Sequence, residues 1–182
     1  MPHLLAPMVE YKSFDKMRLG LPAGAGAIKI SFVTPTLLQL PRIRARRWGM
    51  RQVHFLFPVP SLMFWSLAAH WNAFAPEGLR IPKPRKLAVY SNYSMVLVDH
   101  RVRPFTAVYD ERRRPRGFVG WALYRLEGGS PKLDEWLLRL LDYANFVGIG
   151  RSRSIGFGVS RVEFVRGAQQ PGQREAGEGG VG

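Results

Sequence analysis

The residues best suited to chemistry in this chain lie in the segment GIGRSRSIGFG, from Gly148 to Gly158. Two Gly-x-Gly pairs flank five residues in which two arginines alternate with two serines. Glycine lets a backbone approach another group closely, while guanidinium groups pair with phosphate oxygens through two parallel hydrogen bonds. The segment therefore predicts a phosphate-contacting loop made by Gly148, Gly150, Arg151, Ser152, Arg153, Ser154, Gly156 and Gly158.

This glycine spacing differs from that of the two common nucleotide-binding loops. A dinucleotide-binding fingerprint follows a strand, opens a helix and has its third glycine three residues after the second. Here a predicted helix precedes the loop, a predicted strand follows it, and position 153 is an arginine; a Gly-Lys-Ser/Thr triplet is also missing from the sequence. The simpler alternative is that Gly148 caps the preceding helix. Because capping does not explain four glycines and two arginines, we favour phosphate contact.

Histidines are the candidates for proton transfer, because imidazole titrates near neutral pH. His54 lies beside a basic loop, and His100 is followed closely by two arginines. His70 shares a polar stripe with Ser66 on an otherwise apolar segment, as a hydrogen-bonded core histidine would; His3 lies near the N-terminus. The catalytic candidates are His54, His100 and His70, although a structural or solvated role is the simpler interpretation for each. No His/Asp/Glu cluster has metal-ligand spacing, so neither a metal nor another cofactor is expected.

Two further clusters of arginines carry much of the positive charge. The first surrounds Trp48 and is predicted to hold a nucleic-acid backbone while the indole stacks on a base; a solvated loop is an equally good interpretation. It consists of Arg42, Arg44, Arg46, Arg47 and Arg51. The second lies at the tip of a predicted hairpin, where it is either solvated or inserted into an RNA groove: Arg112, Arg113, Arg114 and Arg116.

The net charge of the whole chain indicates which class of partner it binds. Among 182 residues there are 27 Lys and Arg but 13 Asp and Glu, a formal net charge of +14. Such a field attracts polyanions, so nucleic acid or an anionic membrane surface is expected; a general compositional preference for arginine is the alternative. The absence of cysteine excludes disulfides and cysteine nucleophiles. Because Pro58 and Pro60 interrupt the longest apolar run, we expect no membrane span and a cytoplasmic protein.

The elements that position these residues follow from hydrophobic periodicity and turn signals. Strands are expected at 27–35, at 87–110 (one long strand, or two with a bend), at 118–128 and at 157–166; helices are expected at 60–74 and 130–147. The order β-α-β-β-α-β predicts an α+β, ferredoxin-like domain over residues 27–166, in which two helices cover one face of a four-stranded antiparallel sheet. Residues 167–182 have nothing to bury and are expected to form a disordered tail.

Three motifs, in this order along the chain, resemble those of the CRISPR-associated repeat-processing endoribonucleases. These are SFVTPT (residues 31–36), PVPSLMFWSLAAHWNAF (residues 58–74) and the glycine-rich segment. The last is similar to the loop Gly-φ-Gly-x5-Gly-φ-Gly of the superfamily of repeat-associated RNA-binding proteins. The likeness covers about Met8 to Arg166 and corresponds to the C-terminal ferredoxin-like domain of that family.

The resemblance implies binding of CRISPR repeat RNA and a metal-independent cut that leaves a 2′,3′-cyclic phosphate. It assigns RNA contact to the four glycines and to Arg151 and Arg153. Family members usually carry two ferredoxin-like domains, with the most common catalytic histidine in the first; this chain shows the pattern of the second. Residues 1–26 are accordingly expected to be a segment like the one that joins the two domains.

Three interpretations of the function and two further partners remain open from the sequence. The chain is either the nuclease or a non-cleaving RNA-binding subunit of a CRISPR ribonucleoprotein, because the usual catalytic domain is not found in it. A basic ferredoxin-like protein of ribosome association or assembly is the third interpretation, in which the glycines merely cap a helix. Other CRISPR-associated proteins and a second copy of this chain are candidate partners besides RNA.

Overall fold

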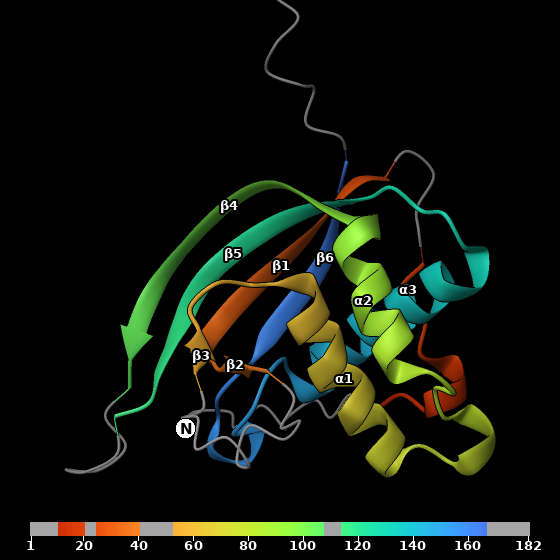
Figure 1. Cartoon of the computed structure of the whole chain (residues 1–182), viewed down its shortest axis with the longest axis horizontal. Helices are drawn as coiled ribbons and strands as arrows, with labels where there is room; N and C mark the ends of the chain where they lie inside the picture. The colour runs from red at the N-terminus through yellow and green to blue at the C-terminus, as the bar shows by residue number, and fades with distance from the viewer. Residues whose placement is uncertain (1–10, 21–24, 41–52, 108–113, 167–182) are drawn as a thin grey trace, which may run out of the picture.

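A twisted antiparallel sheet of four strands, ordered β4-β5-β1-β6, forms one layer of the molecule (Figure 1). The computed structural model describes residues 11–20, 25–40, 53–107 and 114–166. The strands are β1 (Ala25–Thr36), β4 (Met95–Thr106), β5 (Arg116–Leu126) and β6 (Ser160–Arg166). All three strand pairs are antiparallel. The predicted four-stranded sheet is confirmed, and its strand order is that of a ferredoxin-like fold.

Three helices cover one face of this sheet: α1 (Pro60–Phe74), α2 (Pro84–Ser94) and α3 (Pro131–Val147). Each has a proline in its first turn, where a missing N–H costs no intrahelical hydrogen bond. The core lies between the layers. Ile28, Ile30 and Phe32 of β1 are 2% exposed or less and belong to the same apolar cluster as residues of α1 and α3. The alternation of residues in β1 therefore buries one face of the strand, as its sequence predicts.

The helix α2 is the main difference from the sequence prediction. The frequent Val and Tyr residues predict a strand from Leu87, whereas residues 84–94 are helical and the strand begins at Met95. Leu87, Ala88 and Ser91 are buried at helical spacing, so packing against the core outweighs the local β-propensity. The predicted fold class is confirmed, with three helices in place of two.

Two smaller features complete the sheet layer. Strand β4 is continuous, but its register with β5 shifts between Leu97 and Asp99, which answers the question of one strand or two. A second, two-stranded sheet joins β2 (Leu38–Gln39) to β3 (His54–Phe55) and was not expected from the sequence. Its pairing sets Gln39 opposite His54, close to the end of β1.

The described part of the N-terminal segment, residues 11–20, is fixed to the helix layer. The ring of Phe14 meets Trp71 of α1 edge-on, with 4.8 Å between centroids. The carboxylate of Asp142 in α3 accepts hydrogen bonds from Lys12 Nζ at 2.5 Å and from the backbone N–H of Arg18 at 2.7 Å. These contacts hold the segment against α1 and α3.

Some sequence predictions fall outside the described residues. They concern the arginines around Trp48, Arg112 and Arg113 of the hairpin tip, His3, and the tail at 167–182. Within the described ranges, every helix is too short or too polar to cross a membrane.

Candidate functional site

The glycine-rich loop closes on itself where α3 ends and β6 approaches. Gly148 follows α3 with φ of 72° and donates its N–H to Ala144 O at 2.9 Å, and Ile149 N donates to Gly158 O at 2.7 Å. A Cβ atom added to Gly148 would lie 2.3 Å from Gly158 O, and one added to Gly158 would lie 2.1 Å from Ile149 O. Real Cβ atoms do not approach backbone this closely, so both positions require glycine.

The loop is fixed at two points to the end of β1. Arg151 N donates to Leu37 O and Gly158 N donates to Pro35 O, each at 3.0 Å. A Cβ atom on Gly150 would lie 2.7 Å from Leu37 O. A third glycine is therefore required by close packing of protein backbone.

The glycine spacing thus has an explanation within the protein. The capping role considered for Gly148 is confirmed, since it caps α3. Gly156 has a φ of 85° but no neighbour within 4 Å of an added Cβ, so it serves backbone conformation alone. Contact with phosphate stays a prediction, and it depends on the side chains that this tightly packed loop presents.

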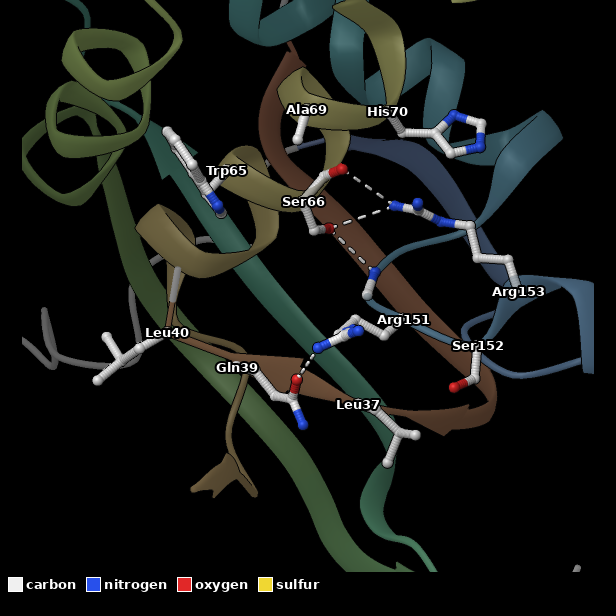
Figure 2. A pocket seen from close by; sticks show the side chains of 11 residues that line it. Leu37, Gln39, Leu40, Trp65, Ser66, Ala69, His70, Arg151, Ser152 and Arg153 are labelled. Atoms are coloured by element: carbon white, nitrogen blue, oxygen red, sulfur yellow. Dashed lines mark hydrogen bonds between the residues drawn. The ribbon is translucent and has the colours of Figure 1, made fainter. Parts of the chain in front are cut away.

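Between the loop and α1 lies an open cavity of about 490 Å³ (Figure 2). One face of α1 contributes residues 65, 66, 69 and 70, which share a side of a helix because of its 3.6-residue period. The lining residues are Leu37, Gln39, Leu40, Trp65, Ser66, Ala69, His70, Gly150, Arg151, Ser152 and Arg153. An indole, two guanidinium groups and hydroxyls are the groups that bind bases and phosphates in single-stranded nucleic acid.

Arg153 ties the loop to α1. Its Nε donates to Gly148 O at 3.2 Å, and its Nη2 donates to Ser66 O and Ser66 Oγ, both at 3.3 Å (Figure 2). Burial lowers the pKa of Arg153 to about 10, so the side chain remains charged at neutral pH. Its hydrogen-bond partners among the described residues are neutral, which leaves a half-buried positive charge at the cavity wall that favours an anion.

Arg151 is exposed and is oriented by Gln39. Its Nη1 donates to Gln39 Oε1 (Figure 2), and the amide nitrogen of Gln39 contacts His54 Nε2. Because the amide oxygen accepts from Arg151, the amide NH2 donates to His54, which assigns the imidazole proton to Nδ1. That nitrogen then donates to Arg116 O at 3.3 Å. His54 is therefore connected to the loop through one side chain.

His70 faces the same cavity from α1. Its Nδ1 lies 2.8 Å from the hydroxyl of Tyr143, and its ring packs against Phe74 with 4.7 Å between centroids. Burial, and secondarily the charge of Arg153, lower the pKa of His70. The imidazole is consequently neutral at neutral pH and is able to accept a proton.

The predicted residues thus fall into two groups. Gly150, Arg151, Ser152, Arg153 and His70 line one cavity, and His54 is joined to it through Gln39. His100 lies apart: it is exposed on β4, with its ring 5.1 Å from that of Phe57. Also outside the cavity lining are the exposed Ser154 and Gly156 and the exposed Arg114 and Arg116 at the start of β5.

Sequence reasoning missed Gln39 and Trp65. Gln39 carries no recognisable motif and reaches the loop only because β2 pairs with β3. Trp65 has a weak signal, since it immediately precedes Ser66 in the polar stripe that also contains His70. Its ring lies under the guanidinium of Arg85, 5.9 Å from centroid to Cζ.

Comparison with known proteins decides the family. Residues 30–160 match the family model described as "CRISPR-associated endoribonuclease Cas6". The chain belongs to this family. The match contains all three motifs that carried the resemblance in the sequence, so that resemblance is confirmed.

Two curated relatives come from Saccharolobus solfataricus. "CRISPR-associated endoribonuclease Cas6 1" is 28% identical over 150 residues, and "CRISPR-associated endoribonuclease Cas6 2" is 25% identical over 176 residues. The alignments cover 76% and 89% of this chain but 51% and 59% of the relatives. The chain therefore spans somewhat more than half the length of the curated relatives it matches.

Solved Cas6 structures share the fold. Thermus thermophilus Cas6 superposes with a TM-score of 0.66 at 22% identity, covering 84% of this chain and 58% of that one. A Cas6 mutant superposes with a TM-score of 0.62 at 26% identity, covering 84% of this chain and 57% of the other. The ferredoxin-like architecture is thus that of a Cas6 domain.

Proposed function

We propose that this chain binds CRISPR repeat RNA in the cavity between the glycine-rich loop and α1 and contributes to a metal-independent cut within the repeat. Family membership and the relatives named as endoribonucleases support this class of substrate. One observation carries the choice of site: Arg151 and Arg153, with no carboxylate among their described partners, line one cavity with Trp65. A bound strand would engage all three side chains, with a phosphate on the two guanidinium groups and a base stacked on the indole.

The chemistry needs three groups. A base removes the proton of the ribose 2′-hydroxyl, an acid protonates the departing 5′-oxygen, and a cation stabilises the negative charge that builds on the phosphate. As the 2′-oxygen bonds to phosphorus, the bond from phosphorus to the 5′-oxygen breaks, and a 2′,3′-cyclic phosphate is left. The two arginines supply the cation. His70, neutral and facing the cavity, is the candidate base, and His54 is the second candidate for proton transfer.

The hydrogen bonds of the same histidines favour a second function, binding without cleavage. Both ring nitrogens of His54 are engaged, by Gln39 and Arg116, and Nδ1 of His70 is engaged by Tyr143. Proton transfer by His54 therefore requires that an existing contact be broken. In this alternative the cavity holds repeat RNA as part of a CRISPR ribonucleoprotein, and other polypeptide supplies the cut.

Incubation of the chain with the direct repeat of a CRISPR array from its own genome, in EDTA, tests the two functions. A cut product that resists 3′-end ligation until its cyclic phosphate is opened and removed supports the first. A gel shift without a cut supports the second. Equal affinity for the repeat and a shuffled RNA, without a cut, overturns both and favours the assembly-protein interpretation.

A matched pair of variants tests the site itself. Arg151→Gln removes the exposed guanidinium of the cavity and is expected to weaken repeat binding about tenfold, as loss of a charge-assisted hydrogen bond does. Arg161→Gln removes another exposed arginine, on β6 and outside the cavity, and serves as the control for loss of one positive charge. Equal effects of the two substitutions would show that the cavity is not where the repeat binds.

A further inference from the structure

A second cavity, of about 290 Å³, lies between the first turns of α2 and α3. Its floor is apolar and includes Leu87 of α2 and the half-buried ring of Trp136 of α3. Three exposed lysines surround it: Lys83, which immediately precedes α2, Lys86 of α2 and Lys132 of α3. The volume is at the small end of the range for ligand pockets, so it admits a group the size of one nucleotide and excludes a helix or a strand pair.

The acids beside this cavity are engaged with other groups than its lysines. Asp134 accepts a hydrogen bond from the hydroxyl of Tyr90 at 2.6 Å, and Glu135 pairs with Arg139 at 3.5 Å. Among the described residues, the three lysines have no carboxylate within ion-pair distance. A cavity with an apolar floor and a rim of lysines outside ion pairs fits a ligand that has both a flat apolar part and an anionic part.

The ring of Trp136 is held in place by two contacts within the protein. Trp71 meets it edge-on, with 5.9 Å between centroids, and the guanidinium of Arg139 lies 5.1 Å from its centroid. Such an indole costs little conformational entropy when a base packs on it, because its rotamer is already fixed.

The second cavity is linked to the first through the same turn of α2. Arg85, between Lys83 and Lys86 in the sequence, lies over the ring of Trp65, and Trp65 lines the cavity of the glycine-rich loop. Basic and aromatic side chains therefore continue from one cavity toward the other. This is the arrangement by which proteins follow a single-stranded backbone.

We propose that the cavity between α2 and α3 is a second subsite for single-stranded RNA, which holds one nucleotide of the strand that leaves the loop cavity. The phosphate lies among the three lysines and the base contacts Trp136. This inference rests on the proposed function, because it takes the strand bound by the loop as its source. A free nucleotide offers the same chemistry, so the test must separate the two sources.

Lysine acetylation of the full chain, read by mass spectrometry with and without repeat RNA, provides the direct test. RNA is expected to lower the reactivity of Lys83, Lys86 and Lys132 at least threefold, while the exposed Lys16 in the N-terminal segment stays unchanged. RNA that binds by gel shift but leaves the three lysines as reactive as Lys16 overturns the subsite and spares the proposed function; RNA that does not bind overturns both. If 5′-AMP protects the three lysines but RNA does not, the ligand of the subsite is a free nucleotide, and the proposal that it comes from the bound strand is overturned.

A charge-matched pair of triple variants tests the contribution to affinity. Lys83→Gln/Lys86→Gln/Lys132→Gln removes the rim, and Lys16→Gln/Arg18→Gln/Arg161→Gln removes three exposed cations that line neither cavity. For single strands each phosphate contact contributes about 0.7 to the slope of log K against log salt. Because the subsite holds one phosphate, the rim variant is expected to lower this slope by about 0.7, and the control variant by clearly less. Equal slopes in the two variants overturn the proposal.

Discussion

The glycine-rich loop and the outer strand β4 both carry a pair of arginines, but the two regions hold them differently. In the loop, Arg153 is anchored to Gly148 and Ser66, and Arg151 is oriented by Gln39. In β4, Arg101 and Arg103 are exposed on a strand that pairs on one side with β5. The guanidinium of Arg103 lies 5.9 Å from the ring of its neighbour Phe105.

The way in which the arginines are held distinguishes general attraction of a polyanion from recognition of a particular ligand. Exposed arginines attract any polyanion, and their contribution depends on salt more than on sequence. Arginines fixed by hydrogen bonds at a cavity wall select the position and direction of a phosphate, because their geometry is set before the ligand arrives. Charge therefore indicates a polyanionic partner, while the hydrogen bonds of the loop are what supports the proposed site.

The largest expected effect is on the backbone of the loop. Gly158→Ala combines a positive φ of 75° with a Cβ 2.1 Å from Ile149 O, so a loss of about 2–5 kcal/mol in the free energy of unfolding is expected. Gly156→Ala has a similar φ but open space around it, and its expected cost is about 1–2 kcal/mol. Urea denaturation of both variants measures the difference. Equal losses would contradict the crossing of the loop ends.

The next effect is on the anchoring of the arginines. Arg153→Gln removes charge-assisted hydrogen bonds to Gly148 O and Ser66 and is expected to cost about 1.5–3 kcal/mol of stability. Arg103→Gln on β4 is expected to change stability by about 0.5 kcal/mol or less, as exposed substitutions do. Thermal unfolding compares them. If Arg103→Gln were the more damaging change, the contrast between the two regions would be lost.

A smaller effect concerns RNA discrimination. Gln39→Leu removes the contact that orients Arg151. The guanidinium of Arg151 should then be as little constrained as those of the arginines on β4. We expect a loss of a few-fold in the preference for repeat RNA over a shuffled RNA, with affinity for the shuffled RNA retained, since a charge-assisted hydrogen bond is lost but the charge is kept. Arg101→Gln should instead lower both affinities by the same factor. Competition binding measures both ratios, and an unchanged ratio in Gln39→Leu would remove Gln39 from the site.

The smallest effect is on pH dependence. Burial lowers the pKa of His70 in the folded chain. At a pH below the unfolded value of about 6.5, the unfolded chain therefore binds more protons than the folded chain, and the folded chain loses stability as the pH decreases. His70→Gln should therefore lose less stability than the parent chain between pH 7 and pH 5. His100→Gln, which removes an exposed histidine of β4, is the control. A parental pH profile in His70→Gln would contradict the burial of this imidazole.

Much of the fold was predictable because its signals are local. The alternation of Ile28, Ile30 and Phe32 indicates β1, and the stripe through Leu137, Leu141 and Ala144 indicates α3. The helix α2 was not predictable in this way, since the β-propensity of its valine and tyrosines points to a strand. What decides its structure is the apolar surface of α1 and α3 on which it packs, and periodicity within the segment does not describe that surface.

The site was predictable in part for the same reason. The glycine spacing indicates the loop in the sequence. Ser66 and His70 are recognisable as a polar stripe on an otherwise apolar helix. Gln39 and Trp65 join the loop from more than 80 positions away, through strand pairing and helix packing. The reason for three of the glycines, backbone crossing backbone, exists only in three dimensions.

The attachment of the loop on both sides of Thr36 has a kinetic consequence. Arg151 N bonds to Leu37 O, and Gly158 N bonds to Pro35 O, so the arginine-bearing wall moves as one piece with β1. In the proposed site, an incoming strand would meet a wall whose described residues are already in place before binding. Association of the RNA should then be as fast as electrostatically steered diffusion permits. The lifetime of the complex should be set by the dissociation rate alone.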